Sequence, residues 1–320
     1  VIFVATSCVS PLTGFAFWET NLAYEGESIY NYLQVKNLSD RTILSTNVLF
    51  GVQSVTMKDK GLTGMYYDTA LAAPALADNA NSALILGMGT GTYARQLKQY
   101  YPKMNITGVE IDQKITDLAG EYFDEPADIP VTTYDGRAWL AASHDKYDVI
   151  MVDAYQDITI PFQMSSTEFF TMVREHLNPG GVMVVNMNMI SDGQGSINEA
   201  LSDTIASVFG NGNTLTADVP NTTNRELFAK KPGSGSEENS MQQASKALNL
   251  RETTYERTGS EDLEWYMEEV ASRFRKVNEP DSASTILTDD KAPVEVLGMH
   301  AIDQIIADEA GPYRQILKDE

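Results

Sequence analysis

The sequence predicts an α/β fold built on a doubly wound sheet, with a small antiparallel β-unit before it and a helical tail after it. The first supporting observation is the stretch from Ala83 to Asp112, where an apolar run, three alternating glycines, a helical pattern and a second apolar run follow one another. The second is that apolar runs of strand length and segments of helical periodicity keep alternating as far as about Lys230. That order is typical of βαβ units.

Residues 24–64 are expected to form the N-terminal β-unit. The runs SIYNYLQVKN, RTILSTN and GVQSVTM mix apolar, β-branched and aromatic residues, and polar turns separate them. After a glycine-rich break, the segment ALAAPALA predicts a helix that Pro74 interrupts or restarts, because proline has no amide hydrogen to donate. We assign this helix and the sheet that follows to a Rossmann-like nucleotide-binding domain over residues 65–230.

Within that domain, each further element has its own local signal. Asp112 can cap the helix QKITDLAGEYF, and the residues SSTE have the capping-box pattern in front of EFFTMVREHL. The clearest strand is YDVIMVD, a buried apolar run that ends at Asp153. The remaining predicted elements are the strand IPVTTY, the helix RAWLAA, the strand VMVVNMN, a helix over roughly 196–209 and strands near 214–219 and 226–230.

The two ends of the chain differ from its centre. Residues 231–320 are expected to hold a linker, KKPGSGSEENS, and a mainly helical region in which Ser260 caps a helix. The first eighteen residues carry no charge. Two interpretations of residues 1–23 stay open: the remnant of a membrane segment, which would make the chain the cytoplasmic domain of a membrane protein, or an ordinary buried strand or helix.

Composition limits the classes of function. The chain has 45 acidic and 23 basic residues, a net charge of −22, which argues against a nucleic-acid partner because phosphate binding depends on clustered Lys and Arg. The same charge would attract a small cationic amine, or it simply keeps the surface solvated. A single cysteine, Cys8, excludes an internal disulfide and fits a cytoplasmic, reducing location. The three histidines are scattered, so no metal site is expected.

The turn with the three alternating glycines predicts a site for an adenosine group. The alternative interpretation is a turn that binds no ligand. Gly87, Gly89 and Gly91 allow backbone angles that a side chain forbids, and they let a ligand lie against the main chain. Glu110 follows Gly91 by 19 residues, at the end of the next strand, where a carboxylate can accept both hydroxyls of a ribose. Since Thr92 stands where the dinucleotide fingerprint has its third glycine, a ligand of the S-adenosylmethionine type fits better than NAD.

Further acids follow the later strands, and ligands of such sheets bind at the edge where the strands end. We expect Asp135 to accept a hydrogen bond from the adenine amino group and Asp153 to face the reacting end of the ligand. The loop DAYQD adds the ring of Tyr155 and a second carboxylate, Asp157. A carboxylate that orients an amine and accepts its proton, beside an aromatic face, suits transfer from a sulfonium donor to an amine without a metal. The structural alternatives are a turn residue for Asp153 and simple packing for Tyr155.

A resemblance adds to this interpretation. The ordered succession that carries it is YEGESIYNYLQV, GMGTGT, VEID, YDGRAWL, YDVIMVDAYQD, EFF...LNPGGVMVVN and LTDDKAPVE. Over roughly residues 24–295 the chain resembles the spermidine/spermine synthase family of aminopropyltransferases, most closely the synthase-like domains fused behind bacterial membrane segments. The resemblance implies a methyltransferase-like Rossmann domain, a homodimer or higher oligomer, decarboxylated S-adenosylmethionine as donor and a polyamine as acceptor.

Residues and resemblance together give the candidate site. Its members are, for catalysis, Asp153, Tyr155, Asp157 and Tyr66; for the adenosine donor, Gly87, Gly89, Thr90, Gly91, Glu110, Asp135 and Gly136; and for the amine, Asn31, Gln53 and Gln156. Two positions depart from the family's pattern. Thr90 stands where the family's G-G-G-D-G-G loop has the aspartate that holds the donor's ammonium group. Gln156 replaces the second acid of D-S-S-D, with Asp157 one position away.

Three functions therefore stay open. The first is aminopropyl transfer in polyamine biosynthesis. The second is methyl transfer from intact S-adenosylmethionine, since Thr90 lacks the carboxylate that would select against the donor's own carboxylate. The third is a non-catalytic adenosine-ligand-binding or sensor domain of a membrane protein, which the uncharged N-terminal stretch and the altered amine site favour.

Overall fold

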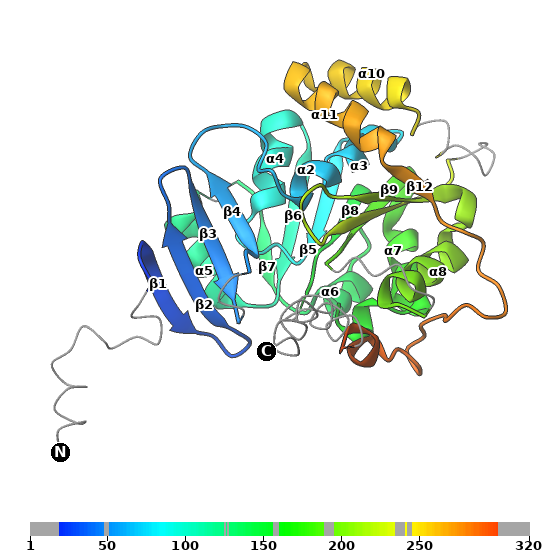
Figure 1. Ribbon diagram of the computed structural model, residues 1–320, viewed down its shortest axis with the longest axis horizontal. Helices are drawn as coiled ribbons and strands as arrows, with labels where there is room; N and C mark the ends of the chain where they lie inside the picture. The colour runs from blue at the N-terminus through cyan, green and yellow to red at the C-terminus, as the bar shows by residue number, and fades with distance from the viewer. Residues whose placement is uncertain are drawn as a thin grey trace, which may run out of the picture.

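The computed structural model describes residues 19–47, 51–124, 126, 128–155, 160–188, 195–233, 241 and 245–299. These residues form a four-stranded sheet near the N-terminus and an eight-stranded sheet with helices on both faces (Figure 1). The predicted α/β fold with a small antiparallel β-unit in front is confirmed.

The small sheet packs on one helix of the large domain. Its strands are β1 (Leu22–Glu27), β2 (Tyr32–Asn37), β3 (Arg41–Thr46) and β4 (Ser54–Met57), each antiparallel to the next. Its buried face lies against α5 (Gln113–Tyr122), and Figure 1 shows this helix beside the blue strands. The side chains that share the contact are Leu33, Val35, Leu44, Ile115, Leu118 and Phe123.

A threonine ties β4 to the glycine turn. The Thr92 hydroxyl accepts a hydrogen bond from the Val55 N–H at 3.1 Å and donates one to the Val55 carbonyl at 2.8 Å. Arg95 donates to the same carbonyl at 2.8 Å. A glycine at position 92 would remove the hydroxyl that makes the first two bonds. The residue that departs from the dinucleotide fingerprint therefore has a structural role, because it holds the small sheet against the turn.

The large sheet is mixed. Its strands lie in the order β12, β10, β11, β9, β8, β5, β6, β7. Their bounds are β5 Ser82–Leu86, β6 Asn105–Glu110, β7 Val131–Thr133, β8 Tyr147–Val152, β9 Leu177–Met187, β10 Thr214–Asp218, β11 Arg225–Lys230 and β12 Phe274–Lys276. Strands β5 to β9 are parallel and the other three pair antiparallel. The chain goes outward from β5 to β7 and returns to β8 on the other side of β5, so the strand order reverses between β5 and β8. Ligands of such sheets bind at this reversal.

Strand β12 is the main difference from the predicted layout. It lies in the region expected to be linker and helix, yet it pairs with β10 at the edge of the sheet, with Arg275 opposite Thr216. Helices α10 (Ala247–Thr258) and α11 (Glu261–Ser272) lead the chain back to this edge. Phe274 then packs edge-on against Phe228 of β11, with ring centroids 5.6 Å apart. Three residues carry too short a pattern for a strand to be predicted from sequence.

Three helices begin at the capping residues that the sequence predicts. The side chains of Asp112, Ser166 and Ser260 each accept a backbone N–H at the start of α5, α7 (Thr167–His176) and α11. Further helices are α2 (Tyr66–Ala70), α3 (Ala72–Leu76), α4 (Thr92–Tyr100), α6 (Gly136–Ala142) and α8 (Ile197–Phe209), with 3₁₀ turns η1 (Phe162–Met164) and η2 (Asn211–Asn213).

The break expected near Pro74 separates α2 from α3. Because Pro74 has no N–H for the carbonyl of Ala70, that carbonyl accepts a hydrogen bond from the Tyr93 hydroxyl instead, at 3.1 Å. The short helix α2 is thus fixed to α4, and α2 carries Tyr66.

The core has one layer on each face of the large sheet. Helices α2, α3, α4, α10 and α11 cover one face, and α6, α7 and α8 cover the other (Figure 1). Across the described ranges, no helix is long and apolar enough to cross a membrane. The interpretation of residues 1–23 as a membrane remnant falls mainly on residues 1–18, which lie outside those ranges.

Candidate functional site

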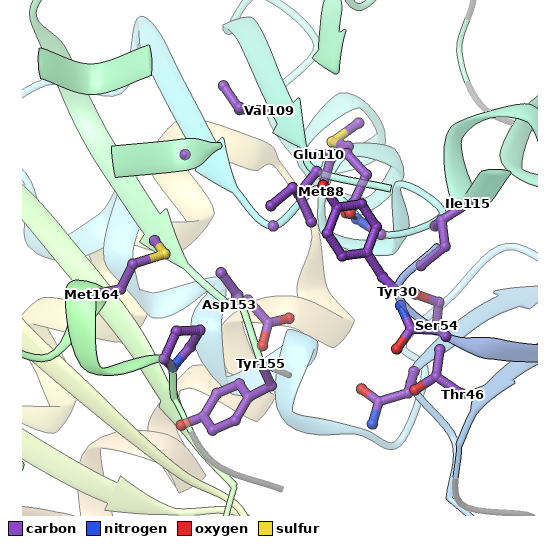
Figure 2. A pocket seen from close by; sticks show the side chains of 18 of the residues that line it. Tyr30, Thr46, Ser54, Met88, Val109, Glu110, Ile115, Asp153, Tyr155 and Met164 are labelled. Carbon is purple, nitrogen blue, oxygen red and sulfur yellow. Dashed lines mark hydrogen bonds between the residues drawn. The ribbon is translucent and has the colours of Figure 1, made fainter. Parts of the chain in front are cut away.

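A pocket lies where the strand order reverses, at the carboxyl ends of β5, β6 and β8. Figure 2 shows Glu110 and Asp153 reaching it from different strands. Nine of the predicted site residues line it, namely Asn31, Gln53, Gly87, Gly89, Glu110, Asp135, Gly136, Asp153 and Tyr155. Parallel strands that end at one edge bring seven of these residues together, although they are far apart in the sequence. The other two, Asn31 and Gln53, directly precede β2 and β4 of the small sheet.

The glycine turn is closely packed against the next strand end. Gly87 has a φ of +87°, and a Cβ built on it would lie 2.3 Å from the carbonyl oxygen of Asp153. At Gly89, with φ +56°, a Cβ would lie 2.8 Å from the Ser54 hydroxyl. Only glycine combines this backbone conformation with this approach. The turn therefore sets the position of the Asp153 backbone as well as one wall of the pocket.

Glu110 fixes the same turn from the opposite side. One carboxylate oxygen accepts the Gly89 N–H at 2.7 Å and the other accepts the Asp112 N–H at 3.0 Å. Burial raises the pKa of Glu110, while the hydrogen bonds from the Asp112 and Gly89 amides oppose that rise. The carboxylate is held at the pocket wall by backbone donors, where a ribose would meet it.

The wall of the pocket near the end of β7 has one acid, and several apolar side chains also line the pocket. Asp135 caps α6 by accepting the Ala138 N–H at 2.8 Å, and it lies at the pocket wall together with Gly136. The apolar lining, which sequence reasoning did not assign, consists of Met88, Val109, Ile111, Ile115 and Met164. A mostly apolar lining with a few fixed polar groups is typical of pockets that bind small molecules and cofactors.

Asp153 is held through both carboxylate oxygens. The Tyr66 hydroxyl donates to Oδ2 at 2.6 Å, and the Asn186 amide donates to Oδ1 at 3.0 Å. Asn224 in turn donates to the Asn186 side-chain oxygen at 2.8 Å, which fixes the orientation of that amide. Burial raises the pKa of Asp153 to about 6, against the two hydrogen bonds, which lower it. The carboxylate is therefore ionised at neutral pH and still basic enough to accept a proton.

Tyr155 contributes its ring to the pocket. Its hydroxyl donates to the Asn186 carbonyl and accepts the Asn188 N–H at 3.2 Å. Because backbone groups use the hydroxyl both as donor and as acceptor, a ligand in the pocket would meet the face of the ring. Figure 2 shows this ring beside Asp153.

Three predicted residues do not line the pocket. Tyr66 is buried behind Asp153 and stacks on Tyr67, with ring centroids 4.0 Å apart. Gly91 forms the N-terminal cap of α4. Thr90 is fully buried, and among the described residues its hydroxyl has no hydrogen-bond partner.

Two further predicted residues, Gln156 and Asp157, lie outside the described residues. The other two residues predicted to bind the amine, Asn31 and Gln53, line the pocket and also make contacts within the protein. Asn31 donates to Asp112 at 3.1 Å and accepts from Asn47 at 2.9 Å. The backbone carbonyl of Gln53 accepts the Tyr67 hydroxyl at 2.7 Å.

Sequence reasoning missed Ser54, Tyr67 and Asn186, all of which contact the predicted residues. Asn186 lies within the strand motif VMVVNMN, where a polar residue inside an apolar run was the available signal. Throughout the ranges that the structure describes, no group of three or more His, Cys, Asp or Glu side chains is arranged to hold a metal ion.

The chain is similar in sequence to known proteins over much of its length. The model of the spermine/spermidine synthase domain matches residues 65–231. A polyamine aminopropyltransferase of Vibrio vulnificus is 28% identical over 220 residues, which are 66% of this chain and 72% of that protein. The chain spans from 25% to 72% of the length of the curated relatives that lead the comparison.

Solved structures show the same fold. A probable spermidine synthase from Corynebacterium glutamicum has a TM-score of 0.58 and 22% identity, and the match covers 83% of this chain and 99% of that one. A spermidine synthase in complex with the transition-state analogue AdoDATO has a TM-score of 0.55 and 20% identity, covering 67% of this chain and 75% of that one.

Proposed function

The chain belongs to the spermine/spermidine synthase family, and from this premise we propose that it transfers an aminopropyl group from decarboxylated S-adenosylmethionine to an amine. The observation that carries the proposal is Asp153, an ionised carboxylate held by Tyr66 and Asn186 at the inner end of a pocket suited to adenosine. Its raised pKa, about 6, suits a group that accepts a proton near neutral pH.

The donor's adenosine would be held by the backbone turn and two acids. Glu110 receives the ribose hydroxyls, and Asp135 lies near the adenine amino group. Gly87 and Gly89 let the donor approach the main chain. A spermidine synthase solved in complex with the transition-state analogue AdoDATO has the same fold, which supports a donor site in a domain of this kind.

The transfer exchanges one bond for another. The acceptor nitrogen forms a bond to the propyl carbon attached to sulfur, the C–S bond breaks, and its electron pair leaves with the neutral thioether methylthioadenosine. Asp153 orients the attacking amine and takes the proton that the nitrogen loses. The ring of Tyr155 lies against the positive charge that donor and acceptor bring into the pocket.

One observation keeps a second function in view. Position 90 holds a threonine where the family has an aspartate, so no carboxylate there selects against the carboxylate of intact S-adenosylmethionine. A methyltransferase that uses the intact donor is therefore the alternative. Calorimetric titration with both donors separates the two: tighter binding of the decarboxylated form supports aminopropyl transfer, and tighter binding of the intact form supports methyl transfer.

The direct test is turnover. Purified protein is incubated with decarboxylated S-adenosylmethionine and a panel of mono-, di- and polyamines, and methylthioadenosine release is measured by chromatography. We expect release with at least one amine and its loss in D153N. The exposed-surface variant D145N serves as the matched control. Absence of release with every amine would refute the proposed function.

A further inference from the structure

The segment LTDDKAPVE, residues 287–295, carries the last part of the sequence resemblance, but the proposed mechanism does not use it. All of its residues are described by the structure, and none of them lines the pocket. The backbones of Thr288 and Lys291 pair across a tight turn, with hydrogen bonds of 3.0 and 2.9 Å. Asp289 lies in this turn, and its side chain contacts two helices.

Asp289 binds Arg137 through both of its carboxylate oxygens. The guanidinium donates from Nη1 to Oδ1 at 2.7 Å and from Nη2 to Oδ2 at 2.6 Å. Two parallel bonds of this kind fix the angle of a guanidinium as well as its position. The hydrogen bonding of Arg137 lowers the pKa of Asp289, so the carboxylate stays charged at neutral pH. This bidentate geometry distinguishes the pair from ordinary surface ion pairs, which contribute little.

The turn is also fixed to the beginning of α7. The Ser166 hydroxyl donates to Oδ1 of Asp289 at 2.5 Å, and the Asp289 N–H donates to the Glu168 carboxylate at 3.0 Å. Two residues earlier, the carbonyl of the fully buried Leu287 accepts the Thr167 N–H at 2.9 Å. Because three hydrogen bonds join the turn to α7, the position of the Asp289 carboxylate is set by the fold and not by Arg137 alone.

Arg137 connects this turn to the wall of the pocket. It is the second residue of α6 and directly follows Gly136, which lines the pocket. Its Nη1 also donates to the Gln163 carbonyl at 2.8 Å. Gln163 belongs to η1, and both it and its neighbour Met164 line the pocket. One guanidinium therefore joins Asp289 to two segments of the wall, the start of α6 and η1.

The two wall segments also touch each other. A Cβ built on Gly136 would lie 3.6 Å from Cε of Met164, an ordinary van der Waals distance. Figure 2 shows Met164 on the opposite side of the view from Thr46 of the small sheet. Packing sets a minimum separation between the two segments, whereas the bond from Arg137 to the Gln163 carbonyl also sets a maximum. Without the carboxylate that orients it, the Arg137 side chain gains rotational freedom and holds that carbonyl less firmly.

These contacts lie apart from the proposed base. Asp153 receives its hydrogen bonds from Tyr66 and Asn186. Asp289 instead bonds to Arg137 and to the start of α7. A change at Asp289 should therefore affect how the adenosine end of the donor is held, and should leave the transfer step at Asp153 nearly unchanged.

We propose that Asp289 is a positioning residue for the donor. Through Arg137 it holds the start of α6 and η1 at a fixed spacing, so that this wall of the pocket is formed before the adenosine group enters. A preformed wall increases affinity, because binding does not have to order it. The inference takes the identity of the donor from the proposed function, and it adds a group that never touches the donor.

The first experiment compares D289N with the parent in steady-state kinetics. The KM for decarboxylated S-adenosylmethionine should rise about tenfold, because the bidentate charged pair is lost. The kcat and the KM for the best amine of the panel should change less than about threefold. D290N removes the same charge from the next, exposed residue of the turn and is the matched control. An unchanged donor KM in D289N, or an equal rise in D290N, overturns the inference.

The second experiment does not depend on turnover. Calorimetric titration measures the Kd of methylthioadenosine in the parent, D289N, R137M and the double variant. D289N should weaken binding about tenfold in the parent but less than about threefold in R137M, because Asp289 acts through Arg137. Equal weakening in both backgrounds overturns the inference.

The binding data also separate this inference from the proposed function. If the parent releases no methylthioadenosine with any amine, yet D289N weakens methylthioadenosine binding as expected, the proposed function fails and the positioning role stands. If the parent turns over an amine while D289N binds methylthioadenosine like the parent, the proposed function stands and the positioning role fails. A parent that does not bind methylthioadenosine overturns the positioning role, and turnover alone then decides the proposed function.

Thermal unfolding separates positioning from a purely structural role. The Asp289 side chain is 41% exposed, so D289N leaves no cavity in the core and should fold. If D289N melts at a lower temperature but binds methylthioadenosine like the parent, the pair is only structural and the inference is overturned. R137K is the second variant, since lysine keeps the charge but cannot form the paired bonds, and it should also weaken methylthioadenosine binding. If neither variant folds, the inference is overturned as well.

Discussion

The hydroxyl of Tyr66 donates a hydrogen bond of 2.6 Å to Oδ2 of Asp153, which lies 87 residues further along the chain. The bond joins helix α2 to the end of β8 and gives the carboxylate a donor that no neighbour in sequence supplies. It acts against burial, which raises the pKa of Asp153 to about 6. The protonation of the proposed base thus depends on a residue that does not itself line the pocket.

Removal of this hydroxyl in Y66F should move the acid limb of the pH profile upward. Without the Tyr66 bond the ionised form of Asp153 loses about 1.4 kcal/mol or more of stabilisation, so the apparent pKa in kcat/KM should rise by about one unit from 6. The measurement is the kcat/KM for the amine between pH 5 and 9. Y147F, which removes a buried tyrosine hydroxyl at the other end of β8, should leave the profile in place. An unchanged profile in Y66F would show that the bond does not tune the base.

The contact between Gly87 and Asp153 gives a second prediction. A methyl group on Gly87 would meet the Asp153 carbonyl at 2.3 Å in a backbone conformation that alanine avoids. We expect G87A to lower the free energy of unfolding by about 2 kcal/mol or more and to reduce kcat by at least about tenfold, because the Asp153 backbone must shift. Urea unfolding and turnover measure the two effects.

G120A is the matched control for G87A. Gly120 is exposed on α5 with open space around its Cα, and alanine favours a helix over glycine by about 0.5–1 kcal/mol. The control should therefore be as stable as the parent or more stable, with unchanged turnover. Full activity in G87A would contradict the close packing between the turn and Asp153.

The sequence predicted those parts of the site that local patterns determine. Strand ends carry Glu110 and Asp153, and the topology of a parallel sheet places such ends at one edge, so position along the chain was enough. Side chains that come from other layers could not be predicted in this way. Asn186 and Ser54 contact the site through packing between elements whose spacing only the folded chain defines.

The fold shows the same division. Caps at Asp112, Ser166 and Ser260 were predictable because a capping bond spans two or three residues. Strand β12 was not, because it forms where β10 offers an unpaired edge, a property of the assembled sheet.

The raised pKa of Asp153 also predicts how stability changes with pH. Its usual value is 3.8 and its value in the fold is about 6, so between these pH values the folded protein binds more protons at this group than the unfolded chain. The free energy of unfolding therefore falls as the pH rises through this window, by up to about 3 kcal/mol from this group alone. D153N lacks this carboxyl group, so its free energy of unfolding should not show the decrease that Asp153 causes between these pH values.

Urea unfolding of the parent and D153N at pH 4 and pH 7.5 checks this expectation. D153N should gain stability relative to the parent on going from the lower to the higher pH, although it has lost turnover. D145N, an exposed acid before β8, controls for the loss of one negative charge. A constant difference between parent and D153N at both pH values would contradict a desolvated Asp153.

Thr90 decides how the departure from the family's glycine loop should be interpreted. If its side chain faced the donor, restoring the family's aspartate in T90D would improve binding of the decarboxylated donor. In the structure, however, Thr90 is completely buried, and its backbone N–H donates to the Ser54 hydroxyl at 3.3 Å.

We therefore expect T90D to lower the free energy of unfolding by about 2 kcal/mol or more, because it buries a carboxyl group without a partner, and to bring no gain in donor affinity. T90V removes a hydroxyl that has no hydrogen-bond partner among the described residues, so the free energy of unfolding should stay level or rise by up to about 1 kcal/mol. Urea unfolding and calorimetry with the decarboxylated donor measure both variants. If T90D is stable and binds the decarboxylated donor more tightly than the parent, the side chain at position 90 faces the pocket. The threonine would then mean that this protein lacks the family's site for the donor's ammonium group.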